Sequence, residues 1–321
     1  MEKTLQSMQG AGVKVLRTWG FNAINGSELA GALQSGLTYY QVWNSSQWAL
    51  NDGPQGLQRL DHVIETAAKY DIRGAELYIN WIAGSGQTHD VFYTNPEIVS
   101  SYQSYVRTIV ERYKNSPNIF AWELMNEARC AGDLLPSGPS CVAGSETLLK
   151  WYEQQSNFVR TLDPFHMITT GGEGHFFWQD PPEYWFDGTL VSDFNFNGQA
   201  GEDFDRNLGL SNIDFGTYDF PGSNFSVEEW GLGWIEDHAR SASNAGKPVI
   251  LEEFGLSGLV NKSSIYPTWV NRALDTNHAG IMPWQFGQLH LTEDGGNRII
   301  KYTDALNHGA SPNDGKYFEI Y

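Results

Sequence analysis

Hydrophobic residues along this chain recur with two periods that alternate, one typical of helices and one typical of buried strands. Helical spacing predicts helices over residues 3–11, 56–69, 96–113, 145–162, 227–245 and 264–276. Short apolar runs between them predict strands over residues 13–19, 72–79, 119–123, 166–170, 213–218, 248–251 and 279–284. Strands that are apolar on both faces and alternate with helices form parallel βα units. The pattern therefore predicts an α/β fold.

Seven such strands nearly complete a (β/α)8 barrel, and 321 residues are enough for one barrel. The chain begins with a predicted helix, and the last predicted strand is followed by a polar, Gly- and Asn-rich tail without a helical pattern. We expect a TIM barrel that lacks its first strand and last helix in this chain, as in a fragment or an incomplete gene product. We also expect residues 1–321 to form a single domain.

Two of the predicted strands run into carboxylates. Glu127 ends the segment Ala121-Trp-Glu-Leu-Met-Asn-Glu127, and Glu253 ends Val249-Ile-Leu-Glu-Glu253. Strand tips hold side chains rigidly on one face of a barrel. Two carboxyl groups about 5–5.5 Å apart hydrolyse a glycosidic bond with retention. We therefore predict that Glu127 and Glu253 are the catalytic pair of a glycoside hydrolase, with Glu123 and Glu252 in supporting roles on the opposite side of each strand.

Three further residues suit a sugar-binding site around this pair. Asn126 directly precedes Glu127 and can hydrogen-bond a sugar 2-hydroxyl. Arg17 lies near the end of strand 13–19, where a permanent cation lowers the pKa of a nucleophilic carboxyl; a structural ion pair is the alternative. Trp284, at the tip of the last strand, suits the floor of the cleavage site, and a core cap is the alternative.

The composition limits the classes of molecule that the protein is expected to bind. The net charge of −18 argues against nucleic acid, anionic lipid and acidic polysaccharide, whereas 12 Trp suit a neutral carbohydrate. The chemistry needs no cofactor, and we expect no metal site. Cys130 and Cys141 lie in a Gly-, Pro- and Ser-rich stretch where a loop disulfide is expected. Sequons at Asn25, Asn44, Asn224 and Asn261 fit a secreted glycoprotein, although the sequence pattern leads us to expect no signal peptide in this chain.

Several segments resemble the fungal and plant β-mannanases of glycoside hydrolase family 5. They are Val15-Leu-Arg-Thr-Trp-Gly-Phe-Asn22, residues 120–130, 214–217 and 246–255, and Pro283-Trp-Gln285. The resemblance covers nearly the whole chain. It implies a clan A barrel with Glu127 as acid/base and Glu253 as nucleophile, and substrate-binding roles for Arg17, Asn126, Arg129 and Trp284. Trp19 is assigned to substrate binding as well. Gly172-Glu-Gly174 resembles a family segment that borders the active site.

Two departures from the family concern the residues around this pair. Ala128 replaces the usual Pro after the acid/base, which frees the backbone there. The family carries His-x-Tyr on its sixth strand, where this chain has Asp219 and Pro221. An Asp beside Glu127 is expected to raise the pKa of the acid by like-charge repulsion. The nucleophile loses its orienting hydroxyl unless Tyr218 supplies it.

The leading hypothesis is a secreted, monomeric endo-β-1,4-mannanase that acts by double displacement. An exo-β-mannosidase or a β-glucanase is the second enzymatic interpretation, because the insertions over residues 129–146 and 175–202 are long enough to close one end of a cleft. The third interpretation is a catalytically impaired barrel that binds glycans, and it rests on the changes at Asp219 and Pro221.

Overall fold

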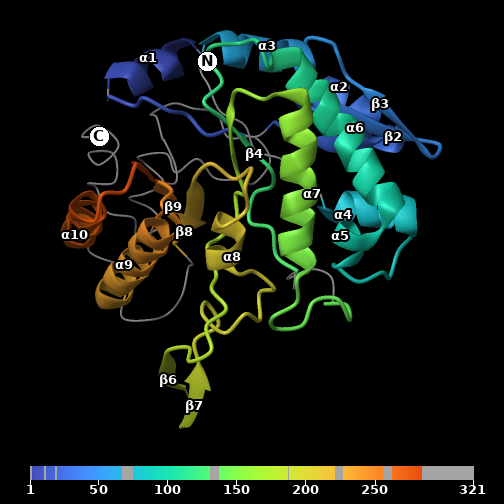
Figure 1. Cartoon of the computed structure of the whole chain (residues 1–321). Coiled ribbons are helices and arrows are strands. Elements are labelled where there is room, and N and C mark those ends of the chain that lie inside the picture. The colour runs from blue at the N-terminus through green and yellow to red at the C-terminus, as the bar shows by residue number, and fades with distance from the viewer. Residues whose placement is uncertain are drawn as a thin grey trace. The chain divides into compact units, whose positions relative to one another are not determined.

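The structure is a computed structural model that describes residues 2–10, 12–18, 20–66, 75–130, 137–186, 188–220, 227–255 and 262–283. Trp19, Pro221, Trp284 and the sequons at Asn224 and Asn261 lie outside the described residues. The chain divides into two compact units, Val15–Asp214 and a second unit that joins Met1–Lys14 to Phe215–Tyr321 (Figure 1). The single domain and the absence of the first strand and last helix stay predictions.

The unit Val15–Asp214 holds most of the helices and strands. In chain order its elements are β1 (Ala23–Asn25), η1 (Gly26–Glu28), α2 (Leu29–Ser35), β2 (Gln41–Asn44), β3 (Gln47–Leu50), α3 (Leu57–Thr66), α4 (Ala75–Tyr78), the π-helix η2 (Ile79–Ala83), α5 (Val91–Thr94), α6 (Pro96–Tyr113), β4 (Ala121–Glu123), α7 (Thr147–Leu162), β5 (Met167–Thr169), β6 (Glu183–Phe186), β7 (Thr189–Ser192) and α8 (Phe204–Leu208).

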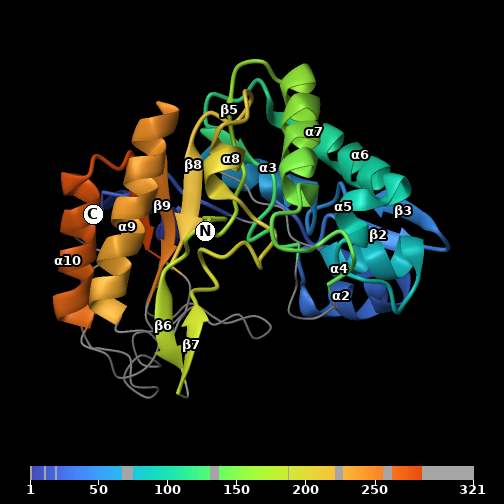
Figure 2. The same cartoon turned by 60° about the horizontal axis from the view of Figure 1, so that its bottom comes forward.

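The strands of this unit form three separate sheets. β4 and β5 are parallel, with Ala121 opposite Met167 and Glu123 opposite Thr169, so their C-terminal ends share one edge. β1 pairs in parallel with β2, which pairs antiparallel with β3. β6 and β7 form an antiparallel hairpin that projects from the rest of the unit in Figure 2. The β4–β5 pair is the part of this unit that carries the predicted acid Glu127.

Long helices pack around a core rich in aromatic residues. Asn95 caps α6 by accepting hydrogen bonds from the backbone N–H groups of Glu97 and Ile98, and Pro96 occupies the first helical turn. The face of α6 at helical spacing is buried, and the ring of Tyr102 lies 5.3 Å from that of Trp151 on α7. This packing fixes both helices beside β4, because the Tyr102 hydroxyl donates to the Leu124 carbonyl at 2.5 Å.

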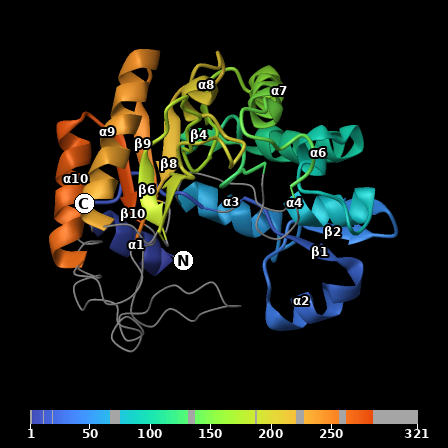
Figure 3. The same cartoon turned by 90° about the horizontal axis from the view of Figure 1, so that it is seen from below.

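The second unit is a three-stranded parallel sheet with helices against it. Its elements are α1 (Glu2–Gly10), β8 (Gly216–Asp219), α9 (Val227–Ala245), β9 (Val249–Phe254), α10 (Lys262–Asp275) and β10 (Gly280–Pro283), and β9 lies between β8 and β10. α9 and α10 run side by side next to the sheet (Figure 3). Trp234, Ile235 and Trp269 on these helices are fully buried. Val249, Ile250 and Leu251 of β9 are all buried, so this part of the strand is apolar on both faces.

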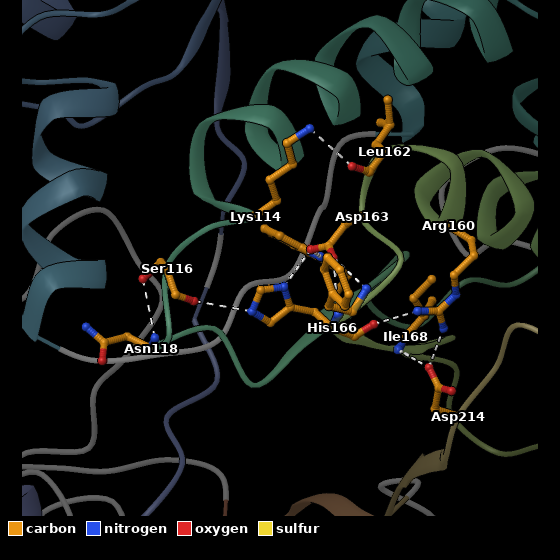
Figure 4. Close-up of polar contacts among 11 residues, drawn as sticks. Lys114, Ser116, Asn118, Arg160, Leu162, Asp163, His166, Ile168 and Asp214 are labelled. Atoms are coloured by element: carbon orange, nitrogen blue, oxygen red, sulfur yellow. Dashed lines mark hydrogen bonds and ion pairs between the residues drawn. The ribbon is translucent and has the colours of Figure 1, made fainter.

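A polar network fixes the N-terminal edge of the β4–β5 pair (Figure 4). The buried carboxylate of Asp163 accepts hydrogen bonds from Nε1 of Trp122 at 2.8 Å and from Nδ1 of His166 at 2.6 Å. Burial raises the pKa of Asp163, but these bonds and two backbone N–H donors outweigh it and leave the pKa lowered. Arg160 pairs with Asp214 at 2.6 Å, and Asp214 also accepts from the Ile168 N–H. At this edge the carboxylates of Asp163 and Asp214 are each matched with hydrogen-bond donors, and these bonds hold the edge in place.

Most of the predicted elements are confirmed. The helices over 96–113 and 227–245 are found with the predicted bounds, and the strands over 119–123, 166–170, 213–218, 248–251 and 279–284 appear as β4, β5, β8, β9 and β10 within a few residues. The helices over 3–11, 145–162 and 264–276 appear as α1, α7 and α10, and α3 lies inside the helix predicted over 56–69. In the helices the hydrophobic periodicity was long enough to identify the element.

Two predicted strands are wrong. Residues 13–18 form no strand, and the described part of 72–79 is helical, as α4 and the start of η2. A short apolar run fits a buried helix as well as a strand, and Tyr78 and Ile79 are buried in the helical form. A parallel strand needs a neighbour to complete its hydrogen bonds. Because the predicted neighbour 72–79 is helical where it is described, residues 13–18 have no strand partner there.

Candidate active site

Glu127 lies four residues beyond β4, in a strained backbone conformation. Its φ of 46° is in the left-handed region, which a non-glycine residue rarely adopts. Its N–H donates to the Gly171 carbonyl at 2.7 Å, and Met125 N–H donates to Thr170. The segment after β4 is therefore held against the segment after β5. Strain of this kind concentrates at functional sites, where the surrounding structure enforces it.

Arg17 forms a buried, two-pronged ion pair with Glu123 at the end of β4. Nη2 of Arg17 lies 2.6 Å from Oε1 of Glu123, and Nε lies 3.0 Å from Oε2. Nη2 also donates to Oδ1 of Asn126 at 2.5 Å. Glu123 thus has a supporting role in orienting Arg17 and, through it, Asn126. The predicted effect of Arg17 on Glu253 stays a prediction, because these residues belong to different units.

Arg129, two residues after Glu127, pairs with Glu173 on the turn after β5. Nη2 of Arg129 donates to Oε1 at 2.6 Å, and its Nε pairs with Oε2. Burial raises the pKa of Glu173, but Arg129 and His175 outweigh it and lower the pKa to about 2. The Tyr93 hydroxyl donates to the Arg129 carbonyl at 2.9 Å. Glu173 is therefore an ionised carboxylate that fixes Arg129 beside Glu127.

A β-bulge directs Glu253 in the second unit. Tyr218 on β8 pairs with Leu251 on β9, but Asp219 pairs with Glu253, so Glu252 is the extra residue of the bulge. Bulges change the direction of side chains and are common beside active sites. As paired residues on neighbouring strands, Asp219 and Glu253 share a face, and a carboxylate oxygen of one lies within 4.8 Å of one of the other. The sheet thus brings the altered position 219 next to the predicted nucleophile.

Tyr218 does not supply the missing hydroxyl, which corrects its assignment to the shell around the catalytic acids. It is fully buried, its ring stacks on His238 of α9 at 3.8 Å, and its hydroxyl hydrogen-bonds Nε2 of His278 at 2.7 Å. Successive strand residues face opposite sides, so Tyr218 faces the helices while Asp219 faces away from them. Burial lowers the pKa of His278 to about 4, which fits a neutral ring packed behind β8.

Some predictions concern residues away from the catalytic acids, and the structure can be compared with these as well. Cys130 and Cys141 form the expected disulfide, with their Cα atoms 5.1 Å apart. Asn44 is exposed at the β2–β3 turn, and Asn25 is partly exposed as the cap of η1. Among the residues that the structure describes, no helix is long and apolar enough to cross a membrane.

The structure brings Arg17, Asn126, Glu127 and Arg129 together in one unit, and Asp219 and Glu253 together in the other. The separation of Glu127 and Glu253 stays a prediction. Trp19 and Trp284 lie outside the described residues, so their substrate-binding roles stay predictions as well. Sequence reasoning missed Glu202, a fully buried residue beside Glu173. No local sequence pattern identifies Glu202. The residues that interact with it lie on the turn about thirty residues earlier in the chain and on α5 and α7.

Comparison with known proteins gives the family. Residues 5–289 match the family model described as Cellulase (glycosyl hydrolase family 5). The chain is 35% identical to a probable mannan endo-1,4-beta-mannosidase A from Aspergillus niger, over 96% of this chain and 73% of that protein. A solved endo-1,4-beta-mannanase from Rhizomucor miehei matches with a TM-score of 0.79 at 30% identity, covering 96% of this chain and 88% of that one. A second, from Thermotoga petrophila, matches with a TM-score of 0.77 at 28% identity, covering 98% and 92%. The chain therefore belongs to glycosyl hydrolase family 5, whose fold is the (β/α)8 barrel.

Proposed function

We propose that this protein is a retaining endo-β-1,4-mannanase in which Glu127 is the acid/base and Glu253 the nucleophile. The observation that carries the proposal is the family match over residues 5–289, which spans both Glu127 and Glu253. The similar proteins from Aspergillus niger and Rhizomucor miehei, both named as mannan-cleaving enzymes, support the substrate. The left-handed backbone at Glu127 and the bulge before Glu253 support the roles of these two acids.

The proposed reaction has two steps. The carboxylate of Glu253 attacks the anomeric carbon while protonated Glu127 gives its proton to the leaving glycosidic oxygen, so the C–O bond breaks and a glycosyl–enzyme ester forms. In the second step ionised Glu127 takes a proton from water, and the resulting hydroxide displaces Glu253. The anomeric configuration is retained, and both carboxyl groups return to their starting states.

Asn126 is the best-prepared group for holding the sugar. Its Oδ1 is occupied by Arg17, whereas none of the described residues accepts a hydrogen bond from its buried Nδ2. A buried donor without a protein acceptor is costly unless a ligand uses it. We propose that a mannose 2-hydroxyl accepts this bond, and that Arg129, Trp19 and Trp284 contact neighbouring parts of the chain of sugars.

Hydrolysis of linear manno-oligosaccharides, followed by product analysis, tests the proposal. We expect internal cleavage into fragments of two or more sugars by the wild-type protein, and no cleavage by Glu253→Ala. Glu236→Ala on α9, an exposed carboxylate paired with Arg272, is a matched control that keeps activity. Release of mannose alone from one chain end contradicts endo action. Cleavage of β-glucan in preference to mannan contradicts the substrate.

A second candidate, a glycan-binding barrel with little turnover, is favoured by Asp219. Its carboxylate lies beside Glu253 on the same face of the sheet, and like charges at short range repel. Comparing wild-type turnover with that of Glu253→Ala, while measuring retention on insoluble mannan, separates the two candidates. Equal turnover with intact retention favours the binding protein.

We also propose that both units belong to one catalytic domain, that the protein acts as a monomer and that it is secreted. The disulfide and the exposed sequon at Asn44 support the oxidising setting of a secreted protein.

A further inference from the structure

Glu202 lies between the two segments that position the proposed acid/base. Cys130 N–H donates to the Ala200 carbonyl at 3.0 Å, which ties the chain before Glu202 to the segment after Glu127. A Cβ at Gly201 would lie 2.3 Å from Cβ of Cys130, so only glycine allows this approach. The Glu202 side chain is 2% exposed.

The turn after β5 wraps around the carboxyl group of Glu202. Oε2 accepts a hydrogen bond from the His175 N–H at 3.1 Å, and the Gly174 N–H donates to the same carboxyl. A Cβ at Gly172 would lie 1.9 Å from Oε1 and 3.1 Å from the Tyr152 hydroxyl. The carboxyl therefore fills the inside of the turn, and a side chain at position 172 would expel it.

The same turn also holds the proposed acid/base in place. Gly171, at its start, accepts the Glu127 N–H, and Glu173, at its centre, holds Arg129. We propose that Glu202 is a positioning residue for Glu127, fixing the 171–175 turn and, through it, the strained backbone of Glu127. This inference rests on the proposed role of Glu127.

The surroundings of Glu202 favour its neutral form. The charged and titratable groups facing it are Glu173 and His175 on the turn, Arg129 after β4, Tyr93 on α5 and Tyr152 on α7. Burial and the charge of Glu173 raise the pKa of Glu202 to about 8, although the two backbone N–H donors and Arg129 oppose this. Ionisation would place a second buried carboxylate next to Glu173, in competition for Arg129.

Three variants separate acceptance of hydrogen bonds from charge and from volume. Glu202→Gln keeps a neutral acceptor, Glu202→Leu fills the space without one, and Glu202→Asp shortens the reach by one methylene. On manno-oligosaccharides we expect the Gln variant to keep kcat within about twofold. The Leu and Asp variants should lose roughly tenfold or more in kcat with little change in KM, because buried N–H groups lose their acceptor. Asp also serves if Leu does not fold.

A substrate-free measurement accompanies the kinetics. Unfolded chains ionise this group near 4.5, whereas the folded protein keeps it neutral up to about 8, so the unfolding free energy falls as the pH rises between these values. We expect urea midpoints to fall less between pH 5 and pH 8 in Glu202→Gln than in the wild type. If the urea midpoints of the two proteins change equally with pH, or if Glu202→Gln loses as much activity as Glu202→Leu, Glu202 does not act in its neutral form. A fully active Leu variant overturns positioning. A wild-type protein that does not cleave mannan but keeps the pH difference refutes the proposed function alone.

Discussion

The two ends of the β4–β5 pair use the same kinds of side chain for different purposes. At the N-terminal end, Asp163, His166 and Arg160 form matched bonds that tie the strands to α7 (Figure 4). At the C-terminal end, Glu127 adopts a left-handed backbone, and the buried Nδ2 of Asn126 has no acceptor among the described residues. At the N-terminal end the polar groups are hydrogen-bonded to their neighbours. The C-terminal end holds backbone strain and a donor that has no acceptor among the described residues.

In this unit the N-terminal end of the β4–β5 pair contributes stability, and the C-terminal end carries the proposed chemistry. In barrels of this kind, the loops after the C-terminal strand ends carry the active site, and the opposite face serves stability. The carboxyl groups follow the same division. Asp163 and Glu173 have a lowered pKa because donors surround them, whereas burial leaves Glu202 with a raised one. Substitutions at the two ends should therefore affect different quantities.

The largest effect is expected at Glu127. Glu127→Gln removes the transferable proton while keeping the shape of the side chain, so kcat on manno-oligosaccharides should fall at least about a hundredfold. The melting temperature should change little, since the backbone strain remains. Glu111→Gln, a half-exposed carboxylate on α6, is the control and should leave both unchanged. A Glu127→Gln variant within tenfold of wild-type kcat would contradict the proposed acid/base.

The opposite end should respond in stability alone. Asp163→Ala leaves the Trp122 N–H, His166 and two backbone N–H groups without their acceptor, so the unfolding free energy should fall by about 4 kcal/mol. Urea unfolding measures the loss, and kcat of the folded fraction should stay near the wild-type value. Asp163→Asn, which keeps one carbonyl oxygen, should cost less. A loss of kcat comparable to that of Glu127→Gln would erase the distinction between the two ends.

Acid should weaken the site end through Glu173. Its pKa is lowered from 4.5 to about 2, so its contribution is present above about pH 5 and is lost as the pH falls toward 2. The difference corresponds to about 3 kcal/mol of unfolding free energy. Unfolding of Glu173→Gln between pH 5 and pH 2.5 should show a smaller decline than the wild type. Parallel curves for the two proteins would rule out this contribution.

The smallest effect tests the strain itself. Glu127→Gly abolishes turnover but relieves the left-handed backbone, and after the entropy that glycine adds to the unfolded chain the protein should gain about 1 kcal/mol. Asn277→Gly, at a φ of 62° in a turn far along the sequence, is the control and should change stability little, because Asn tolerates this conformation. A Glu127→Gly variant less stable than the wild type would show that the backbone stores no strain.

Periodicity identified the elements whose environment is uniform along their length. The helices over 96–113 and 227–245 expose one face and bury the other, so their hydrophobic spacing was sufficient. The run over 72–79 failed because a short buried segment has no polar face, and only its packing partners decide between helix and strand. The hairpin β6–β7 was likewise missed, because Trp185 and Leu190 are apolar but exposed, so hydrophobicity does not mark a buried position there.

The sequence by itself determined the disulfide and the family and predicted the two catalytic acids, because each is written in consecutive or nearly consecutive residues. Only the tertiary structure decided that Arg17 pairs with Glu123, that Tyr218 faces α9 and that Glu202 fills the turn after β5. Their partners lie 106, 20 and 27 residues away in the chain. Pairing across such distances depends on register, on a bulge and on the space that a glycine leaves, and none of these is visible in local spacing.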